Sequence, residues 1–242
     1  MIEKLLKDCI VSSKNIFALI HKGLEDSYFK ENSIGVGGDR SLTIDLYAED
    51  VYISYLKKYG KIISEESGEI GEGDYEIILD PIDGSDNLFS GFPYFGSSIA
   101  LKSGKETIFS FIVNFSNGDF FTRGKNFYKK GSLLNNSLID IEVIERSKIG
   151  IFEKAYANSR IVRDLSIDNI KFRSPGAVAL SLAYAYSVDF VLFVGKIREY
   201  DIAAGLHQCQ DLNIFFERDT LLVSKNYEIF DKIKRVLLKD EV

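Results

Sequence analysis

Asp80-Pro81-Ile82-Asp83-Gly84-Ser85-Asp86-Asn87 directly follows Tyr75-Glu76-Ile77-Ile78-Leu79, a short apolar run that predicts a buried strand. Two carboxylates three residues apart therefore lie where a strand ends, with a proline fixing the turn between them and a glycine freeing the backbone after them. Carboxylate oxygens are the ligands that Mg²⁺ prefers, and the N–H groups of Gly84 and Ser85 suit an oxyanion. The stretch predicts a site that holds metal ions beside a phosphate.

Composition limits the classes of protein to which the chain can belong. Its 242 residues suffice for one large domain or two small ones, and the net charge of -6 argues against nucleic acid as the main partner. Cys9 and Cys209 are too few for a disulfide framework, which favours a reducing compartment. The first predicted helix is charged, unlike a signal peptide, and no apolar run is long enough to span a membrane. We expect a soluble, cytoplasmic protein.

The first 60 residues predict two helices joined by a loop. Apolar residues recur at helical spacing from residue 2 to about residue 29. Residues 33–40 contain three glycines and predict a mobile loop. A second helix follows, and it places Asp45 and Glu49 four residues apart.

The remaining sequence changes from a β pattern to an alternating α/β pattern. Strands are predicted at 97–101, 107–113 and 120–122, with turns at 103–105 and 117–118, which makes an antiparallel meander. After about residue 140, strands such as 190–194 alternate with helices at 177–186, 201–211 and 227–238. We therefore expect a boundary near residue 145, between parts 1–145 and 146–242.

Two further acidic motifs could complete the site. Glu65-Glu66 ends another apolar stretch, and Asp201 stands at a predicted helix N-terminus. Each alone has a simpler explanation, as a solvated loop charge or a helix cap. His21 and His207 are the only histidines and lie on predicted helices, so a Ser-His-Asp triad or a zinc site has little material.

Taken together, these motifs resemble the inositol monophosphatase family, the Mg²⁺-dependent, lithium-sensitive phosphatases related to fructose-1,6-bisphosphatase. The resemblance covers most of the chain, and its pattern is most similar to archaeal enzymes that act on both inositol monophosphate and fructose 1,6-bisphosphate. The segments that carry it are Gly38 to Asp45 with Ala48-Glu49, Ser64 to Ser67, Asp80 to Asn87 with Gly91-Phe92-Pro93, Gly131 to Asn136, Arg173 to Ser181, and Tyr200 to Gly205. Ser85 stands where threonine is usual, and Tyr200 replaces the usual tryptophan.

The resemblance implies an α+β fold, a layered αβαβα sandwich with the active site between its two parts. It also implies two or three Mg²⁺ ions, with Mn²⁺ as a substitute. One ion would be held by Glu65, Asp80 and the backbone carbonyl of Ile82, and a second by Asp80, Asp83 and Asp201.

The catalytic residues are likewise implied by the resemblance. A water activated by the metal would be the nucleophile. Glu65 and a pair formed by Ser85 and Asp45 would orient or deprotonate this water, and Gly84 and Ser85 would bind the phosphate.

Substrate choice is implied by basic residues near the end of the chain. Val194 lies where animal inositol monophosphatases present a glutamate to inositol, whereas Lys196 and Arg198 resemble the basic pair of the archaeal enzymes. Arg173 could supply a further cation to the substrate. The expected function is hydrolysis of a small sugar or polyol phosphate monoester, most of all fructose 1,6-bisphosphate or inositol 1-phosphate, by a homodimer. Two alternatives remain open: a 3′-phosphoadenosine 5′-phosphate phosphatase, and a non-catalytic, cation-regulated binding protein.

Overall fold

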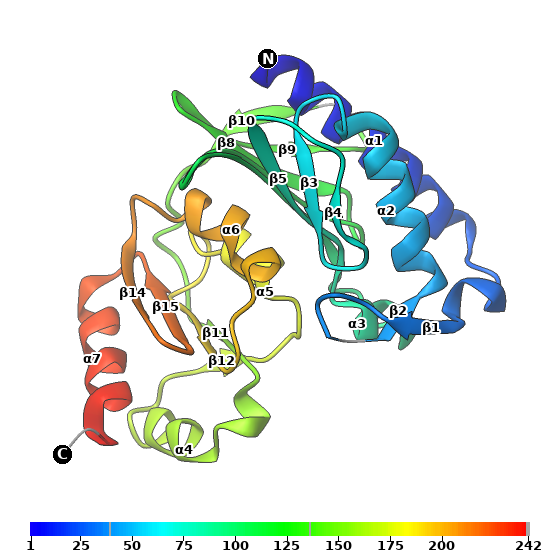
Figure 1. The fold of residues 1–242 in the computed structure, drawn as a ribbon. Coiled ribbons are helices and arrows are strands. Elements are labelled where there is room, and N and C mark those ends of the chain that lie inside the picture. The colour runs from blue at the N-terminus through cyan, green and yellow to red at the C-terminus, as the bar shows by residue number, and fades with distance from the viewer. Residues whose placement is uncertain (39, 136, 241–242) are drawn as a thin grey trace.

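Two β-sheets and the helices around them make up the fold, seen in a computed structural model that describes residues 1–38, 40–135 and 137–240 (Figure 1). The helices are α1 Ile2–Lys22, α2 Thr43–Leu56, α3 Ser85–Phe89, α4 Ser159–Ile167, α5 Val178–Ala183, α6 Glu199–Gln208 and α7 Tyr227–Leu237. Short 3₁₀ helices cover Asp26–Phe29, Ala155–Ala157 and Leu238–Asp240.

The larger sheet has eight strands in the order β10-β9-β8-β7-β6-β5-β3-β4. Its strands are β3 Lys61–Ser64, β4 Gly68–Ile70, β5 Tyr75–Asp83, β6 Gly96–Ser103, β7 Glu106–Asn114, β8 Asp119–Gly124, β9 Phe127–Ser132 and β10 Leu138–Asp140. The smaller sheet has the order β12-β11-β13-β15-β14, from β11 Gly150–Glu153, β12 Phe172–Arg173, β13 Val191–Val194, β14 Asn213–Glu217 and β15 Thr220–Ser224. A separate hairpin pairs β1 Glu31–Ile34 with β2 Arg40–Leu42.

Strand β5 shows why its sequence is a continuous apolar run. Ile77 and Leu79 belong to the hydrophobic cluster formed with α1 and α2, while Ile78 belongs to the cluster on the opposite face, with α5 and α6. Successive side chains of a strand point to opposite faces, so a strand covered on both faces needs apolar residues at every position.

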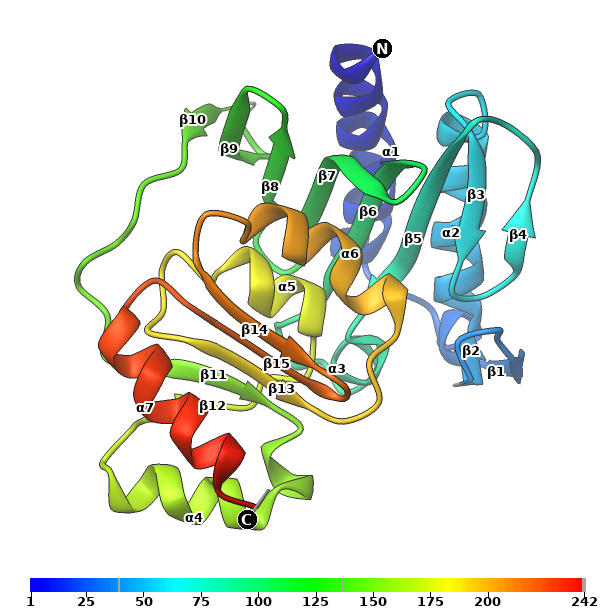
Figure 2. The ribbon, with the colours of Figure 1, turned by 60° about the vertical axis from the view of Figure 1, so that its left-hand side comes forward.

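Helices α5 and α6 form a layer between the two sheets (Figure 2). Small side chains allow this close packing. A Cβ at Gly205 of α6 would lie 2.5 Å from Cβ of Leu182 in α5. Helices α4 and α7 cover the outer face of the smaller sheet. The layers therefore run in the order helix, sheet, helix, sheet, helix, and the predicted α+β sandwich is confirmed.

Local predictions differ from the structure in several places. The strand predicted at 75–79 continues as β5 to Asp83, because residues 80 and 83 still pair with β6, so Asp80 and Asp83 lie within the strand and not in a turn after it. The first helix ends at Lys22, and residues 26–29 form a separate 3₁₀ turn. The prediction of a mobile loop at 33–40 is wrong at both ends of that segment, because β1 and β2 pair there as a hairpin. The glycines instead allow close contact: Gly37 N–H donates to the carbonyl of Glu65 at 2.8 Å, and a Cβ on Gly37 would lie 2.5 Å from Cγ of Glu65.

Some predictions are not settled by the fold. Asp39 and Asn136, which belong to the motif segments from Gly38 and from Gly131, lie outside the described residues. The boundary near residue 145 stays a prediction, because α5 and α6 belong to the second part and yet pack on the first sheet. Within the described ranges, no helix has the length and apolar character needed to cross a membrane.

His207 joins the middle helical layer to the larger sheet. Its Nδ1 lies 2.9 Å from the Ser110 hydroxyl of β7. Burial of the ring, and secondarily the nearby charge of Arg123, lowers the pKa of His207 to about 4. The fold therefore favours the neutral ring.

A pH dependence of stability follows from this histidine. The folded-state pKa lies below the ordinary value of about 6.5, so the stabilisation is present above pH ~6.5 and is lost as the pH falls toward about 4. We expect the melting temperature to fall on acidification through this range, and to fall less steeply in His207→Gln. Thermal denaturation followed by circular dichroism at several pH values measures both slopes. Identical slopes in the two proteins would contradict this role of His207.

Candidate active site

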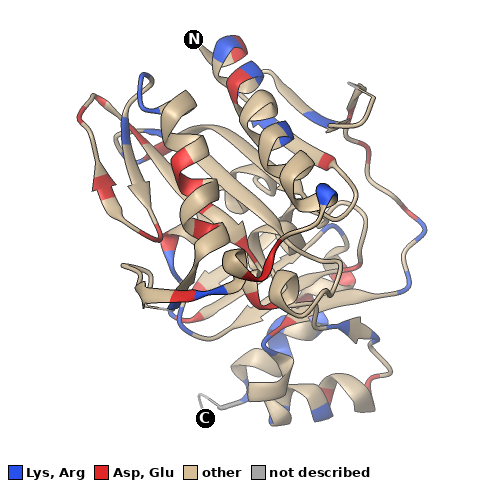
Figure 3. Ribbon diagram, turned by 90° about the vertical axis from the view of Figure 1, so that its right-hand side faces the viewer, with Lys and Arg blue, Asp and Glu red and all other residues tan. Residues whose placement is uncertain are grey.

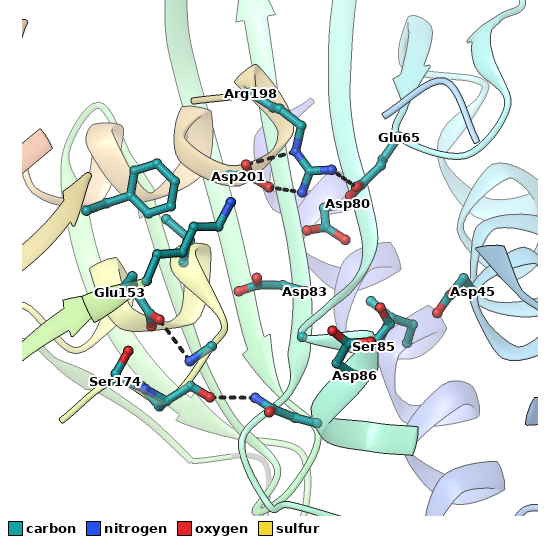
Figure 4. Close-up of a pocket in the computed structure, with 18 of the residues that line it drawn as sticks. Asp45, Glu65, Asp80, Asp83, Ser85, Asp86, Glu153, Ser174, Arg198 and Asp201 are labelled. Atoms are coloured by element: carbon teal, nitrogen blue, oxygen red, sulfur yellow. Dashed lines mark hydrogen bonds and ion pairs between the residues drawn. The ribbon is translucent and has the colours of Figure 1, made fainter. Parts of the chain in front are cut away.

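Three carboxylates from separate elements meet beside the middle helical layer. Oxygens of Glu65, Asp80 and Asp201 all lie within 4.8 Å of one another, and Figure 4 shows them on one side of a pocket. Strands β3 and β5 are parallel neighbours with Ser64 opposite Leu79, so Glu65, just after β3, lies beside Asp80 of β5. Asp201 comes from the first turn of α6, as the sequence predicted.

A β-bulge adds Asp83 to this wall. Residues 80 and 83 are separated by an odd number of positions and would face opposite sides of a regular strand. The register of β5 against β6 shifts between Asp80 and Asp83, and both residues line the pocket. Asp83 Oδ2 accepts a hydrogen bond from Leu180 N–H of α5 at 2.8 Å, which ties the bulge to the middle layer.

Gly84 and Ser85 continue the same wall at the start of α3. Gly84 has φ 86°, a left-handed conformation that favours glycine, and a Cβ there would lie 3.1 Å from the Tyr94 carbonyl oxygen. Both residues line the pocket, together with the predicted ligand Ile82. The structure thus brings Asp80 and residues 82–85 to one surface.

Helix α2 places two buried carboxylates behind this wall. Asp45 Oδ2 accepts from Leu42 N–H at 2.7 Å, while its Oδ1 is buried without a hydrogen-bond partner in the described structure. Glu49 accepts from Ser67 N–H at 3.0 Å and from the Ser67 hydroxyl at 2.5 Å, which anchors the loop that carries Glu65. Asp45 and Ser85 line the pocket together, but no hydrogen bond between them is seen, so their pairing stays a prediction.

The carboxylates repel one another. Burial, and next the charge of Glu65, raises the pKa of Asp80. Burial raises the pKa of Asp83, with a further contribution from Asp201. Burial together with Glu66, Glu65 and Asp86 raises the pKa of Asp45 to about 8. Figure 3 shows acidic segments of several elements gathered near the middle of the molecule.

A bound cation fits this donor set. Asp80 Oδ1 is buried and has no hydrogen-bond partner among the described residues, and a carboxylate oxygen of Asp80 lies within 4.8 Å of oxygens of Glu65 and Asp201. Clustered carboxylate oxygens are the hard ligands that divalent cations such as Mg²⁺ and Mn²⁺ bind. The acidic cluster could therefore hold a metal ion.

The three basic residues predicted to bind substrate are separated in the structure. Arg198 reaches the acidic wall, where its Nε and Nη2 donate to Asp201 at 3.0 and 2.9 Å and its Nη1 lies 2.7 Å from Glu65. Arg173 lines a neighbouring, mostly apolar cavity of about 410 Å³ instead. Lys196 is exposed on the loop after β13 and is absent from the described lining of both cavities.

The opposite wall contains residues that the sequence analysis missed. Glu153, at the end of β11, is 1% exposed and accepts from Gly176 N–H at 2.8 Å, Ala177 N–H at 3.3 Å and the Ser181 hydroxyl at 2.5 Å. Burial raises the pKa of Glu153 despite these donors. The sequence does contain a pattern that could have identified Glu153, because this residue follows an apolar run as Glu65 and Asp80 do.

Glu66 also gains a structural explanation, since it accepts a hydrogen bond from the Ser41 hydroxyl of β2.

The pocket between the two walls has a volume of about 380 Å³. This size is typical of small-molecule sites.

Comparisons with known proteins agree with this geometry. A model of the inositol monophosphatase family matches residues 28–207. The fructose-1,6-bisphosphatase of Pyrococcus furiosus is 32% identical over 179 residues, which are 71% of this chain and 67% of that protein. The fructose-1,6-bisphosphatase/inositol-1-monophosphatase of Archaeoglobus fulgidus is 28% identical over 215 residues, 83% of this chain and 80% of that protein. The crystal structure of an extragenic suppressor protein from Bartonella henselae shares the fold, with a TM-score of 0.79, 22% identity, and coverage of 98% of this chain and 99% of that chain.

Glu153 provides a test of how the second wall is held in place. Glu153→Ala would leave three donors without their acceptor, two of them on the buried residues Ala177 and Ser181, at about 1 to 3 kcal/mol for each buried donor that stays unsatisfied. We expect the free energy of unfolding of the metal-free protein to fall by about 2 to 5 kcal/mol. Urea denaturation measures the change.

Two variants control for the loss of charge and of volume. Glu153→Gln keeps an acceptor oxygen and the side-chain size, so we expect a smaller loss of stability. Glu142→Ala removes an exposed carboxylate and should stay within about 0.5 kcal/mol of wild type. If Glu153→Ala were as stable as Glu142→Ala, the carboxylate would not organise this wall.

Proposed function

The chain belongs to the inositol monophosphatase family, and on this premise we propose that it hydrolyses small sugar or polyol phosphate monoesters. Fructose 1,6-bisphosphate and inositol 1-phosphate are the leading substrates, in agreement with the names of its archaeal relatives. The observation that carries the proposal is the convergence of Glu65, Asp80 and Asp201 in a pocket that also contains Gly84 and Ser85.

We propose Mg²⁺ as the cofactor, in two or three copies, with Mn²⁺ as a substitute. Glu65, Asp80 and the carbonyl of Ile82 would hold one ion, and Asp80, Asp83 and Asp201 a second. When bound, the cations would polarise the phosphoryl oxygens and make water a stronger nucleophile at neutral pH. The partnerless Oδ1 of Asp80 and the raised pKa of Asp80 and Asp83 support a cation at this position.

The chain's own residues would orient the substrate and the attacking water. N–H groups of Gly84 and Ser85 would bind the phosphate from the start of α3. The Ser85 hydroxyl would position the water, with Asp45 Oδ1 as its proton acceptor. Asp45 suits this role because its pKa is raised to about 8, and a general base works best when its pKa lies near the working pH.

We propose a cytoplasmic homodimer as the working state of the protein. The family is commonly dimeric, and this chain has an apolar cavity at the surface beside the half-exposed Phe92. An apolar surface of this kind is typical of interaction sites. The two buried, free cysteines agree with a reducing compartment.

Metal dependence gives the most direct test of the proposed function. We expect release of inorganic phosphate from fructose 1,6-bisphosphate with Mg²⁺ or Mn²⁺ and none after treatment with EDTA. In Asp83→Asn, kcat/KM should fall at least about 100-fold, which corresponds to ~2.7 kcal/mol, because the variant loses a charge that holds the hard cation. The amide oxygen can still accept from Leu180 N–H, so the fold should survive.

Asp50→Asn is the matched control, since Asp50 is an exposed carboxylate of α2. It should keep wild-type turnover. Wild-type turnover in Asp83→Asn at saturating Mg²⁺ would rule out the assigned ligand. No phosphate release from any sugar or polyol phosphate, nor from 3′-phosphoadenosine 5′-phosphate, would leave the non-catalytic binding protein as the better description.

Kinetics of a Ser85 variant can show whether this residue positions the water or binds the substrate. If its hydroxyl orients the water, Ser85→Ala should lower kcat by about 10² to 10⁴-fold, the usual range for general-base assistance, and leave KM largely unchanged. The backbone N–H of residue 85 remains in this variant. Steady-state kinetics at saturating Mg²⁺ measure both constants. A rise in KM alone would make Ser85 a binding residue instead.

A further inference from the structure

Lys154 is the residue of the second wall that the proposed chemistry leaves without a role. It follows Glu153 at the end of β11 and lines the pocket. We propose that Lys154 determines specificity by binding a second anionic group, above all a second phosphate, on the alcohol part of the substrate. This inference deepens the proposed function and rests on it.

The position of Lys154 opposite the acidic wall carries the first step. The reacting phosphate would lie on the wall formed by Asp80 to Ser85. The alcohol must then extend toward the wall formed by β11, β13 and the start of α5, where Glu153 and Ser174 lie across the pocket from Ser85 (Figure 4). Lys154 belongs to that far wall, so its ammonium group is suited to the distal end of a substrate.

The charges of the pocket carry the second step. The described basic residues of its lining are Arg40, Lys154 and Arg198. Arg40 is paired with Glu31 at 2.9 Å, and Arg198 is engaged by Glu65 and Asp201. Lys154 instead lies over an aromatic ring, with Nζ 5.2 Å from the centroid of Phe193, and it forms no ion pair within the described residues.

The neighbouring carboxylate of Glu153 does not form an ion pair with the Lys154 ammonium group. Both oxygens of Glu153 accept hydrogen bonds from neutral donors, namely Gly176 N–H, Ala177 N–H and the Ser181 hydroxyl. Burial has the largest effect on the pKa of Glu153, and the charge of Lys154 lowers that pKa less than the three hydrogen bonds do. An anionic ligand would therefore be the strongest partner available to Lys154.

The backbone of Lys154 carries the third step. Its φ of 55° and ψ of 30° place it in the left-handed region, which side chains other than glycine rarely adopt. The conformation is built into the wall, since Asn158 Nδ2 donates to the carbonyls of Lys154 at 3.0 Å and Val194 at 3.1 Å. A strained residue whose side chain lines a pocket is typical of a functional position.

Two phosphonates provide the test without depending on turnover. Hexane-1,6-diylbisphosphonate carries two anionic groups, hexylphosphonate carries one, and neither can be hydrolysed. Titration calorimetry with Mg²⁺ present should show that the wild type binds the bisphosphonate about 10- to 150-fold more tightly, the range for one charge-assisted hydrogen bond. Lys154→Met should lose this preference and bind hexylphosphonate as before, and Lys154→Arg should retain it.

Further variants distinguish Lys154 from the other lysines. Methionine has nearly the length of lysine and, like lysine, an unbranched Cβ. The backbone strain at residue 154 is therefore similar in Lys154→Met and in the wild type. Lys125→Met changes an exposed lysine of the turn between β8 and β9 and should behave as wild type. Lys196→Met tests the lysine that the sequence analysis expected to bind substrate. If Lys196→Met lost the preference for the bisphosphonate and Lys154→Met kept it, the inference would be overturned.

The remaining outcomes are equally decisive. No preference for the bisphosphonate in the wild type, or the same loss on both phosphonates in Lys154→Met, would overturn the inference. In kinetics, Lys154→Met should lower kcat/KM for fructose 1,6-bisphosphate about 10- to 150-fold and spare inositol 1-phosphate. A Lys154-dependent binding preference without any phosphate release would overturn the proposed function and keep the binding role, so the two failures are distinguishable.

Discussion

Repulsion among buried carboxylates is the constraint on which the rest of this structure depends. Asp80, Asp83 and Asp201 are all at most 6% exposed, and the pKa of Asp80 and Asp83 is raised by burial and by their neighbours. Charges removed from water in this way destabilise a fold unless a partner compensates them. Here the compensation comes from outside the acidic wall, through the guanidinium of Arg198 and the N–H of Leu180.

The layered architecture supplies the stability that this arrangement requires. Apolar residues of β5 pack on α1 and α2 on one face and on α5 and α6 on the other, so the strand that carries Asp80 and Asp83 is fixed along its length. The same helices α5 and α6 carry Leu180 and Asp201 to the acidic wall. Packing of the middle layer and geometry of the site are therefore coupled: a shift of either helix would change the distances among the carboxylates.

The sequence predicts those parts of the site that depend on local pattern. An apolar run followed by an acid identified β5 with Asp80 and β3 with Glu65, and the helix start identified Asp201. The bulge that turns Asp83 to the same side as Asp80 depends on pairing with β6, which the local sequence does not show. The separation of Arg173, in β12, and of Lys196 from Arg198 likewise depends on tertiary structure, although Lys196 and Arg198 share the segment between β13 and α6. The family resemblance grouped these residues, whereas tertiary structure decides which of them reach the pocket.

The two walls of the pocket are under different physical constraints. The acidic wall needs carboxylates at fixed mutual distances, and the larger sheet and α6 hold Glu65, Asp80 and Asp201 in place. The far wall combines core residues such as Glu153 and Phe193 with Lys154, Tyr156 and Ser174, and the hydrophobic clusters of the core do not include these last three. A change at these positions alters the charge and shape that a substrate alcohol meets, at little cost to packing. Recognition of the alcohol can therefore vary at these turn residues while the carboxylates that face the phosphate keep their positions, although α5 supports both walls through Leu180 and Ser181.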